Sequence, residues 1–311
     1  MVTSEDIETA YERIAGRVRR TPVMDIAAET FGTPSAICLK LELFQHAGSF
    51  KPRGAFNNLL SREVPEAGVA AASGGNHGAA VAYAARSLGI PARIFVPEIS
   101  SPVKVGRIRG FGADVLVEGA AYADALERCE AFMADSGAVG VHAYDSPETI
   151  AGQGTVALEW QEQEPDLDTV LVAVGGAGLI SGIAAWYGGR TRVVGVEPET
   201  SRALHAALEE GRPVDVPVSG LAADSLGARS VGDHNFEICR TYVDHVALVP
   251  DTAIGEAQRL LWDRARIAAE PGGATALAAV VCGAYRPRAD ERVGVLVCGG
   301  NVDLAKLSAL A

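Results

Sequence analysis

The sequence predicts an α/β protein with two open, twisted, mainly parallel sheets, each covered by helices on both faces. Short and wholly apolar runs alternate with amphipathic stretches along the chain, which is typical of strands buried in parallel sheets. The length of 311 residues exceeds what a single hydrophobic core usually supports, so two domains are expected. The 35 glycines suit the tight turns that such an alternation requires.

Each element follows from its local pattern. Ser4 is expected to cap a first helix that runs to about Arg17, with acids in its first turn. Apolar runs predict strands at 36–41, 69–72, 92–96, 114–117, 139–142, 170–174, 192–196 and 293–297. Amphipathic stretches predict helices at 78–88, 102–110, 122–136, 179–187 and 253–268. An interruption at residues 145–147 suggests a large domain of residues 1–57 and 147–311 and a small domain of residues 58–146.

Composition excludes several classes of protein. The net charge of −12 argues against nucleic acid or an anionic membrane as a partner, and no apolar run is long enough to span a bilayer. The five cysteines are odd in number and widely spaced, which favours reduced thiols and a cytoplasmic location. The histidines and cysteines show no metal-ligand spacing, so no metal site is expected.

The stretch Ser49-Phe50-Lys51-Pro52 is the most informative in the chain. Proline suits the first helical position, so a helix is expected to start at Pro52 with Lys51 at its mouth. The positive end of that helix disfavours a second positive charge and helps to keep the amine neutral. A neutral amine can form a Schiff base with an aldehyde. An isolated lysine is more often a solvated surface residue, so this interpretation depends on the motifs that follow.

Two glycine-containing loops follow predicted strands and open predicted helices. The loop of residues 73–78, Ser-Gly-Gly-Asn-His-Gly, offers backbone amides that suit a carboxylate, although an ordinary helix cap has the same pattern. The loop of residues 175–178, Gly-Gly-Ala-Gly, offers amides that suit a phosphate. The second loop also imitates a dinucleotide fingerprint, with Glu197 about where a ribose-binding acid is expected. A nicotinamide-dependent dehydrogenase therefore stays an open alternative.

Together these motifs suggest one ligand. Lys51 suits an aldehyde, residues 175–178 suit a phosphate, and Cys298 ends a strand at the same predicted edge. Pyridoxal 5′-phosphate (PLP) contains an aldehyde, an aromatic ring and a phosphate. Nearly the whole chain, from Thr21 to Asp303, resembles the fold-type II PLP enzymes of the threonine/serine dehydratase and serine racemase group, in the tryptophan synthase beta superfamily. The resemblance rests on six ordered motifs: residues 49–51, 73–78, 150–155, 175–179, 270–271 and 298–301.

The resemblance implies a role for each site residue. Lys51 would hold PLP covalently and remove the α-proton of the substrate, while Phe50 would pack against the ring. Asn76 would bond the phenolic oxygen and Cys298 would contact the ring nitrogen. The phosphate would be held by Gly175, Gly176, Ala177, Gly178 and Leu179. The substrate carboxylate would be held by Ser73, Gly75, Asn76 and His77.

Three positions depart from the pattern of the group. Ala177 replaces a glycine of the usual loop, so its backbone angle is expected to suit a β-carbon. Gly74 stands where the racemases carry a second catalytic serine. Part of the group binds a divalent cation through an acid like Glu197 and a second acid, but Ala203 stands at the second position. Metal binding is therefore not expected.

The resemblance implies a lyase that converts a small β-hydroxy-α-amino acid, L-threonine or L-serine, to a 2-oxo acid and ammonia. A serine racemase or a hydroxyaspartate dehydratase on the same cofactor is the main alternative. A dehydrogenase and a non-catalytic ligand-binding relative are further alternatives. The family also suggests a homodimer.

Overall fold

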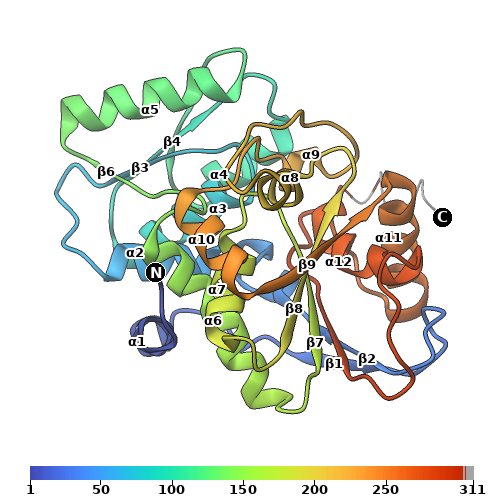
Figure 1. Ribbon diagram of the computed structural model, residues 1–311. Helices are drawn as coiled ribbons and strands as arrows, with labels where there is room; N and C mark the ends of the chain where they lie inside the picture. Colours follow the sequence, from blue (N-terminus) through green and yellow to red (C-terminus); the bar gives the residue numbers. More distant parts are fainter. Residues whose placement is uncertain (304, 306–311) are drawn as a thin grey trace.

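Within residues 1–303 and 305, which the computed structural model describes, the chain forms two separate sheets (Figure 1). The larger has six strands in the order β1 (Val23–Ile26), β2 (Ile37–Lys40), β10 (Val293–Leu296), β7 (Thr169–Ala173), β8 (Arg192–Pro198) and β9 (Val243–Val249). The smaller has the order β5 (Asp114–Val117), β4 (Ala92–Val96), β3 (Val69–Ala72) and β6 (Val139–Gly140). All neighbouring strands are parallel except β1 and β2. The predicted α/β class is confirmed.

Helices connect the strands in a regular alternation. Their bounds are α1 (Ser4–Ile14), α2 (Lys51–Leu60), α3 (Asn76–Leu88), α4 (Pro102–Gly110), α5 (Tyr122–Ser136), α6 (Pro147–Gln163), α7 (Gly178–Tyr187), α8 (Ala203–Glu210), α9 (Ala223–Leu226), α10 (Asp233–Tyr242), α11 (Asp251–Ala265) and α12 (Pro271–Val281). Two 3₁₀ turns, η1 (Glu42–Phe44) and η2 (His46–Gly48), precede α2. In the larger sheet, α7 and α12 pack on opposite faces (Figure 1).

Helices α3, α7 and α11 begin one or two residues before the predicted position, and the starts of α1 and α2 also differ from the prediction. Thr3, and not Ser4, caps α1: its hydroxyl accepts a hydrogen bond from Asp6 N at 3.2 Å, and the Asp6 carboxylate accepts one from Thr3 N at 2.9 Å. This reciprocal capping box satisfies two backbone donors at once. Helix α2 begins at Lys51, one residue earlier than expected, with Pro52 inside its first turn.

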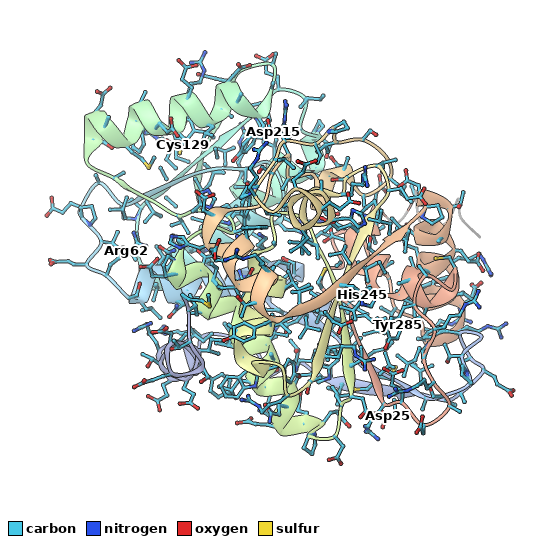
Figure 2. All side chains as sticks on the ribbon, in the orientation of Figure 1. Asp25, Arg62, Cys129, Asp215, His245 and Tyr285 are labelled. Atoms are coloured by element: carbon cyan, nitrogen blue, oxygen red, sulfur yellow. The ribbon has the colours of Figure 1, made fainter. Side chains whose placement is uncertain are left out.

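The smaller sheet shows why short apolar strands predict layers on both faces. Ala70 and Ala72 of β3 pack in one cluster with Cys129. Cys129 is labelled on α5 in Figure 2. Val69 and Ala71 belong to another cluster, with residues of α2, α3 and α4. Because side chains alternate along a strand, a strand covered on both faces must be apolar throughout.

Helix α2 lies where the two sheet systems meet. It packs against α3 beside the smaller sheet and against α6, which belongs to the layers around the larger sheet. Its residues Ala55, Phe56 and Leu59 are part of the hydrophobic cluster of the smaller sheet. The division into residues 1–57 with 147–311 and residues 58–146 stays a prediction.

A buried cluster of four charged side chains fixes α2 to its neighbours; its members are Lys40, Glu42, Arg53 and Glu159. Arg53 Nη2 lies 2.7 Å from Glu42 Oε1 and 3.0 Å from Glu159 Oε2. Lys40 Nζ lies 2.6 Å from Glu159 Oε1. None of these side chains is more than 2% exposed to solvent. Because a buried charge is costly once its partner is removed, α2 is held firmly against β2 and α6.

We expect Glu159→Gln to lower the free energy of unfolding by about 3–5 kcal/mol, because it leaves buried cations without full compensation. Glu162→Gln is the matched control on the same helix. Glu162 pairs with Arg20 at 2.6 Å, but both side chains are about half exposed, so the loss should stay below about 1 kcal/mol. Urea unfolding followed by circular dichroism measures both. Equal losses in the two variants would contradict the role given to the cluster.

Candidate active site

The segment before Lys51 is hydrogen-bonded to the residues that follow strand β10. The backbone of this segment, residues 48–50, pairs with residues 298–300 that follow β10. Phe50 N donates to Cys298 O at 3.1 Å, and the amide of residue 300 donates to the carbonyl of residue 48 at 2.9 Å. These bonds place Lys51 and Cys298 at the carboxyl edge of the larger sheet, where open α/β sheets bind ligands.

The amine of Lys51 is held in a partly buried position. Its Nζ donates a hydrogen bond to Ala143 O at 2.7 Å and lies 5.1 Å from the centroid of the Phe50 ring. Burial lowers the pKa of Lys51 to about 8, and the neighbouring Cys298 opposes that shift only partly. Desolvation is thus the main cause of the neutral amine that the sequence predicted from the helix end.

The loop of residues 175–179 has the form of a phosphate cradle. It joins β7 to α7, and none of its five backbone amides donates to an acceptor in the described part of the chain. Tyr144 packs directly on the loop: a β-carbon at Gly176 would overlap its ring, and one at Gly178 would lie 2.6 Å from its carbonyl oxygen. Since Tyr144 follows Ala143, the loop and the Lys51 amine contact the same short segment.

Ala177 has a backbone angle that favours glycine. Its φ is +69°, in the left-handed region, and its side chain is buried at the start of α7. The expectation that this angle suits a β-carbon is therefore wrong. A β-carbon in the left-handed region collides with the following carbonyl and costs roughly 1–2 kcal/mol.

The loop after β3 forms a second cradle. Ser73 Oγ accepts a hydrogen bond from Gly75 N at 3.2 Å. The backbone amides of Asn76, His77 and the next residue, at the start of α3, have no acceptor within the residues described. A helix start with free amides suits a carboxylate, as the sequence predicted.

The side chain of Asn76 is held from two distant segments. Its Nδ2 donates to Glu270 Oε1 at 2.6 Å, and its Oδ1 accepts from Asn301 Nδ2 at 2.7 Å. These partners are 194 and 225 residues away in the sequence. The motif match included residues 270 and 301, but nothing local in the sequence could have assigned them this role.

The other ionisable groups of the site are shifted toward their neutral forms. Burial lowers the pKa of His77 to about 3, and its Nε2 lies 2.8 Å from Val141 O. Burial raises the pKa of Glu270 to about 7, although the bond from Asn76 opposes this. Burial and the Glu270 carboxyl raise the pKa of the Cys298 thiol, which donates to a backbone carbonyl 3.5 Å away.

Glu197 is occupied by the fold. Both carboxylate oxygens accept backbone bonds at 2.8 Å, from Leu204 and His205 in the first turn of α8. The carboxyl therefore caps a helix, and burial raises its pKa to about 8. This arrangement explains the acid without a ribose or a cation.

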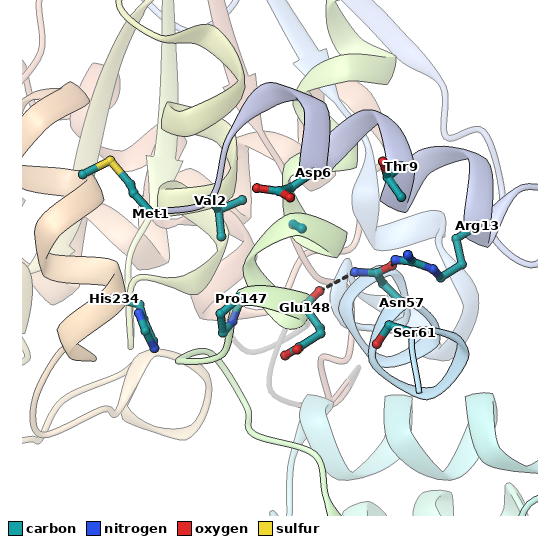
Figure 3. A pocket seen from close by; sticks show the side chains of 11 residues that line it. Met1, Val2, Asp6, Thr9, Arg13, Asn57, Ser61, Pro147, Glu148 and His234 are labelled. Carbon is teal, nitrogen blue, oxygen red and sulfur yellow. Dashed lines mark hydrogen bonds between the residues drawn. The ribbon is translucent and has the colours of Figure 1, made fainter. Parts of the chain in front are cut away.

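A cavity is lined by other residues than those of this site. The cavity of about 310 Å³ is lined by α1, α2 and the starts of α6 and α10, with Arg13, Asn57 and Glu148 on its wall (Figure 3). None of its lining residues is a predicted site residue.

No helix among the described residues is both long and apolar enough to cross a membrane.

Comparison with known proteins identifies the class. Residues 14–299 match the family model described as pyridoxal-phosphate dependent enzyme. Phenylserine dehydratase of Ralstonia pickettii is 40% identical over 300 residues, which cover 94% of this chain and 91% of that protein. L-threonine ammonia-lyase of Thermotoga maritima is 37% identical over 312 residues, with coverages of 98% and 77%. The structure of maize serine racemase matches with a TM-score of 0.93 at 35% identity, covering 99% of this chain and 96% of that one.

Fold and site thus define an enzyme that binds a phosphorylated cofactor at the edge of a parallel sheet. The chain belongs to the pyridoxal-phosphate-dependent enzymes, in the fold-type II group that contains threonine dehydratases and serine racemases. The residues present fit PLP, because a neutral amine suits its aldehyde and five free amides suit its phosphate. The family assignment gives the dehydrogenase alternative no support.

We expect apoprotein to bind PLP covalently faster as the pH rises from 7 to 9, with a midpoint near pH 8. The neutral amine is the attacking form, and its fraction grows as the pH passes the pKa of Lys51. Stopped-flow absorbance measures the rate, and borohydride reduction with peptide mass spectrometry locates the modified lysine. Lys51→Ala, the control, should show no covalent attachment. A midpoint near the ordinary 10.5, or another labelled lysine, would contradict this.

Ala177→Gly should raise the free energy of unfolding of the apoprotein by about 0.5–1 kcal/mol, because glycine accepts a left-handed backbone without strain. Ala184→Gly, inside the same helix, should lower it by about 1 kcal/mol or more, since a helical glycine costs backbone entropy. Thermal unfolding followed by circular dichroism compares the two. A loss of stability in both variants would show that position 177 is not strained.

Proposed function

We propose that this enzyme catalyses the elimination of water and the deamination of a small β-hydroxy-α-amino acid, L-threonine or L-serine. The products are a 2-oxo acid and ammonia. Two relatives support the reaction type: a phenylserine dehydratase and an L-threonine ammonia-lyase, whose names describe loss of water or ammonia from a β-hydroxy-α-amino acid. The net reaction is balanced, because the water that is lost in elimination is regained in hydrolysis.

Lys51 is the central group of the proposal. It would hold the cofactor covalently and, once free, would accept the proton from the substrate α-carbon. A buried amine with a pKa near 8 suits the role of base, because about a tenth of it is neutral at pH 7 and about half at pH 8. When bound, PLP supplies an electron sink for the charge left at the α-carbon.

The remaining residues bind and orient. The amides of residues 175–179 hold the phosphate, and Phe50 packs against the ring. Asn76, fixed by Glu270 and Asn301, has one N–H left to donate to the phenolic oxygen. The substrate carboxylate is held by Ser73, Gly75, Asn76 and His77. The side chain of His77 is turned toward Val141, which leaves its backbone amide for this purpose.

Cys298 is proposed to contact the ring nitrogen as a neutral group, with its single S–H turning away from the backbone carbonyl of residue 272. Its raised pKa keeps the thiol protonated at physiological pH. A thiol cannot hold the ring nitrogen in its charged form as a carboxylate would. A neutral partner at that position would make the bound ring a weaker electron sink than a carboxylate would, which suits elimination of the β-hydroxyl.

One observation carries the choice of lyase over racemase: position 74 has no side chain and no room for one. Racemisation requires proton removal on one face and delivery on the other. The resemblance assigns that delivery to a serine at this position. A β-carbon at Gly74 would overlap Ser100 Oγ. The likeness to maize serine racemase keeps a racemase as the second candidate.

L-Serine should give pyruvate and ammonia as the dominant products, with D-serine below about one-tenth of the ammonia, because position 74 carries no proton donor. Chiral chromatography beside an ammonia assay measures both products in one reaction. Lys51→Ala is the control and should give neither. D-Serine forming as fast as ammonia would replace the lyase with the racemase.

A further inference from the structure

The loops that follow β3 and β4 share one edge of the smaller sheet. The two strands are parallel neighbours, with Ala72 opposite Phe95, and Ser73 N donates to Phe95 O at 2.9 Å. The loop of residues 73–76 after β3 carries the carboxylate cradle. The loop of residues 97–101 after β4 therefore reaches the same carboxyl edge, although no sequence motif assigned it a role.

Ser100 fills the space above Gly74. A β-carbon built on Gly74 would overlap Ser100 Oγ and would lie 3.0 Å from both Ser100 Cβ and Val96 Cγ1. The hydroxyl of Ser100 thus occupies the volume that a side chain at position 74 would take.

The fold does not use this hydroxyl. Ser101, the next residue, caps α4 by accepting from Lys104 N at 3.4 Å. The half-buried Ser100 donates its backbone amide to Pro97 O, but its hydroxyl has no partner in the part of the chain that is described. A partly buried hydroxyl without a partner is available to a ligand.

We propose that Ser100 is a substrate-binding residue whose hydroxyl donates to the α-carboxylate held by residues 73–77. The proposal rests on the proposed function for the location of that carboxylate. A hydroxyl can donate to an anion, and a bond to a charged group is stronger than one between neutral groups. Residues 74 and 100 then form a pair in which one position supplies the hydroxyl and the other leaves room for it.

The first test measures binding without turnover. L-Alanine has the carboxylate but no β-hydroxyl to eliminate, and its binding to the PLP-loaded enzyme is followed by the change in visible absorbance. Ser100→Ala should raise the Kd for L-alanine about tenfold or more, as expected for loss of a charge-assisted bond. Ser101→Ala, the matched control, should leave the Kd within about twofold and lower the thermal unfolding temperature, because it removes a helix cap.

The second test moves the hydroxyl between the two positions. Gly74→Ser and Ser100→Gly should each weaken L-alanine binding about tenfold. The double variant should return to within about threefold of the wild type, because it restores one hydroxyl and the space for it. Such non-additivity is the signature of two positions that share one function.

Several results would overturn the proposal. These are an unchanged Kd in Ser100→Ala, additive losses in the double variant, or a wild-type enzyme that does not bind L-alanine. A loss of D-serine formation in Ser100→Ala with unchanged L-alanine binding would show that the hydroxyl donates protons and does not bind carboxylate. The lyase assignment fails separately, through its products, because L-alanine binding does not depend on elimination.

Discussion

The buried ion cluster around Arg53 is the constraint on which the site depends. Arg53 lies two residues after Lys51, and Glu42 and Glu159 satisfy its guanidinium from two other elements. All of these charges are desolvated. Any shift of α2 that lengthened one ion pair would therefore leave a buried charge without full compensation, which is costly. Packing alone would tolerate small slides of a helix, whereas this cluster gives α2 one favourable position. The cluster thereby also restricts the position of Lys51, because Lys51 lies in the first turn of the same helix.

Around that fixed amine, the fold brings together the ends of several parallel strands. The phosphate cradle follows β7, the carboxylate cradle follows β3, and the strip that holds Lys51 pairs with the residues after β10. Each cradle is a turn into a helix, which leaves backbone amides free. The segment that crosses from β6 to α6 connects them, because Ala143 accepts from Lys51 and Tyr144 packs on the phosphate loop.

Features that depend on local sequence could be predicted, whereas contacts between residues far apart in the sequence could not. Strands β3, β4 and β5 were predicted to the residue, because apolar residues dominate each of them. Strands β1 and β9 were missed because exposed polar residues interrupt their apolar pattern: β1 contains Asp25, and β9 contains Asp244 and His245. The glycine loops and Lys51 were found because their chemistry is local. The contacts of Asn76 with Glu270, and of Gly74 with Ser100, join separate segments and require the folded chain.

Backbone amides, and not charged side chains, form the two anion cradles of the site. Neither cradle uses an arginine or lysine among its predicted residues; both use amides at a helix start, which offer partial positive charge without a mobile ion. Burial is the largest cause of the pKa shifts of Lys51, His77, Glu270 and Cys298, and all four groups shift toward their neutral forms. The anionic cofactor and substrate then bind among ionisable side chains that carry little charge of their own.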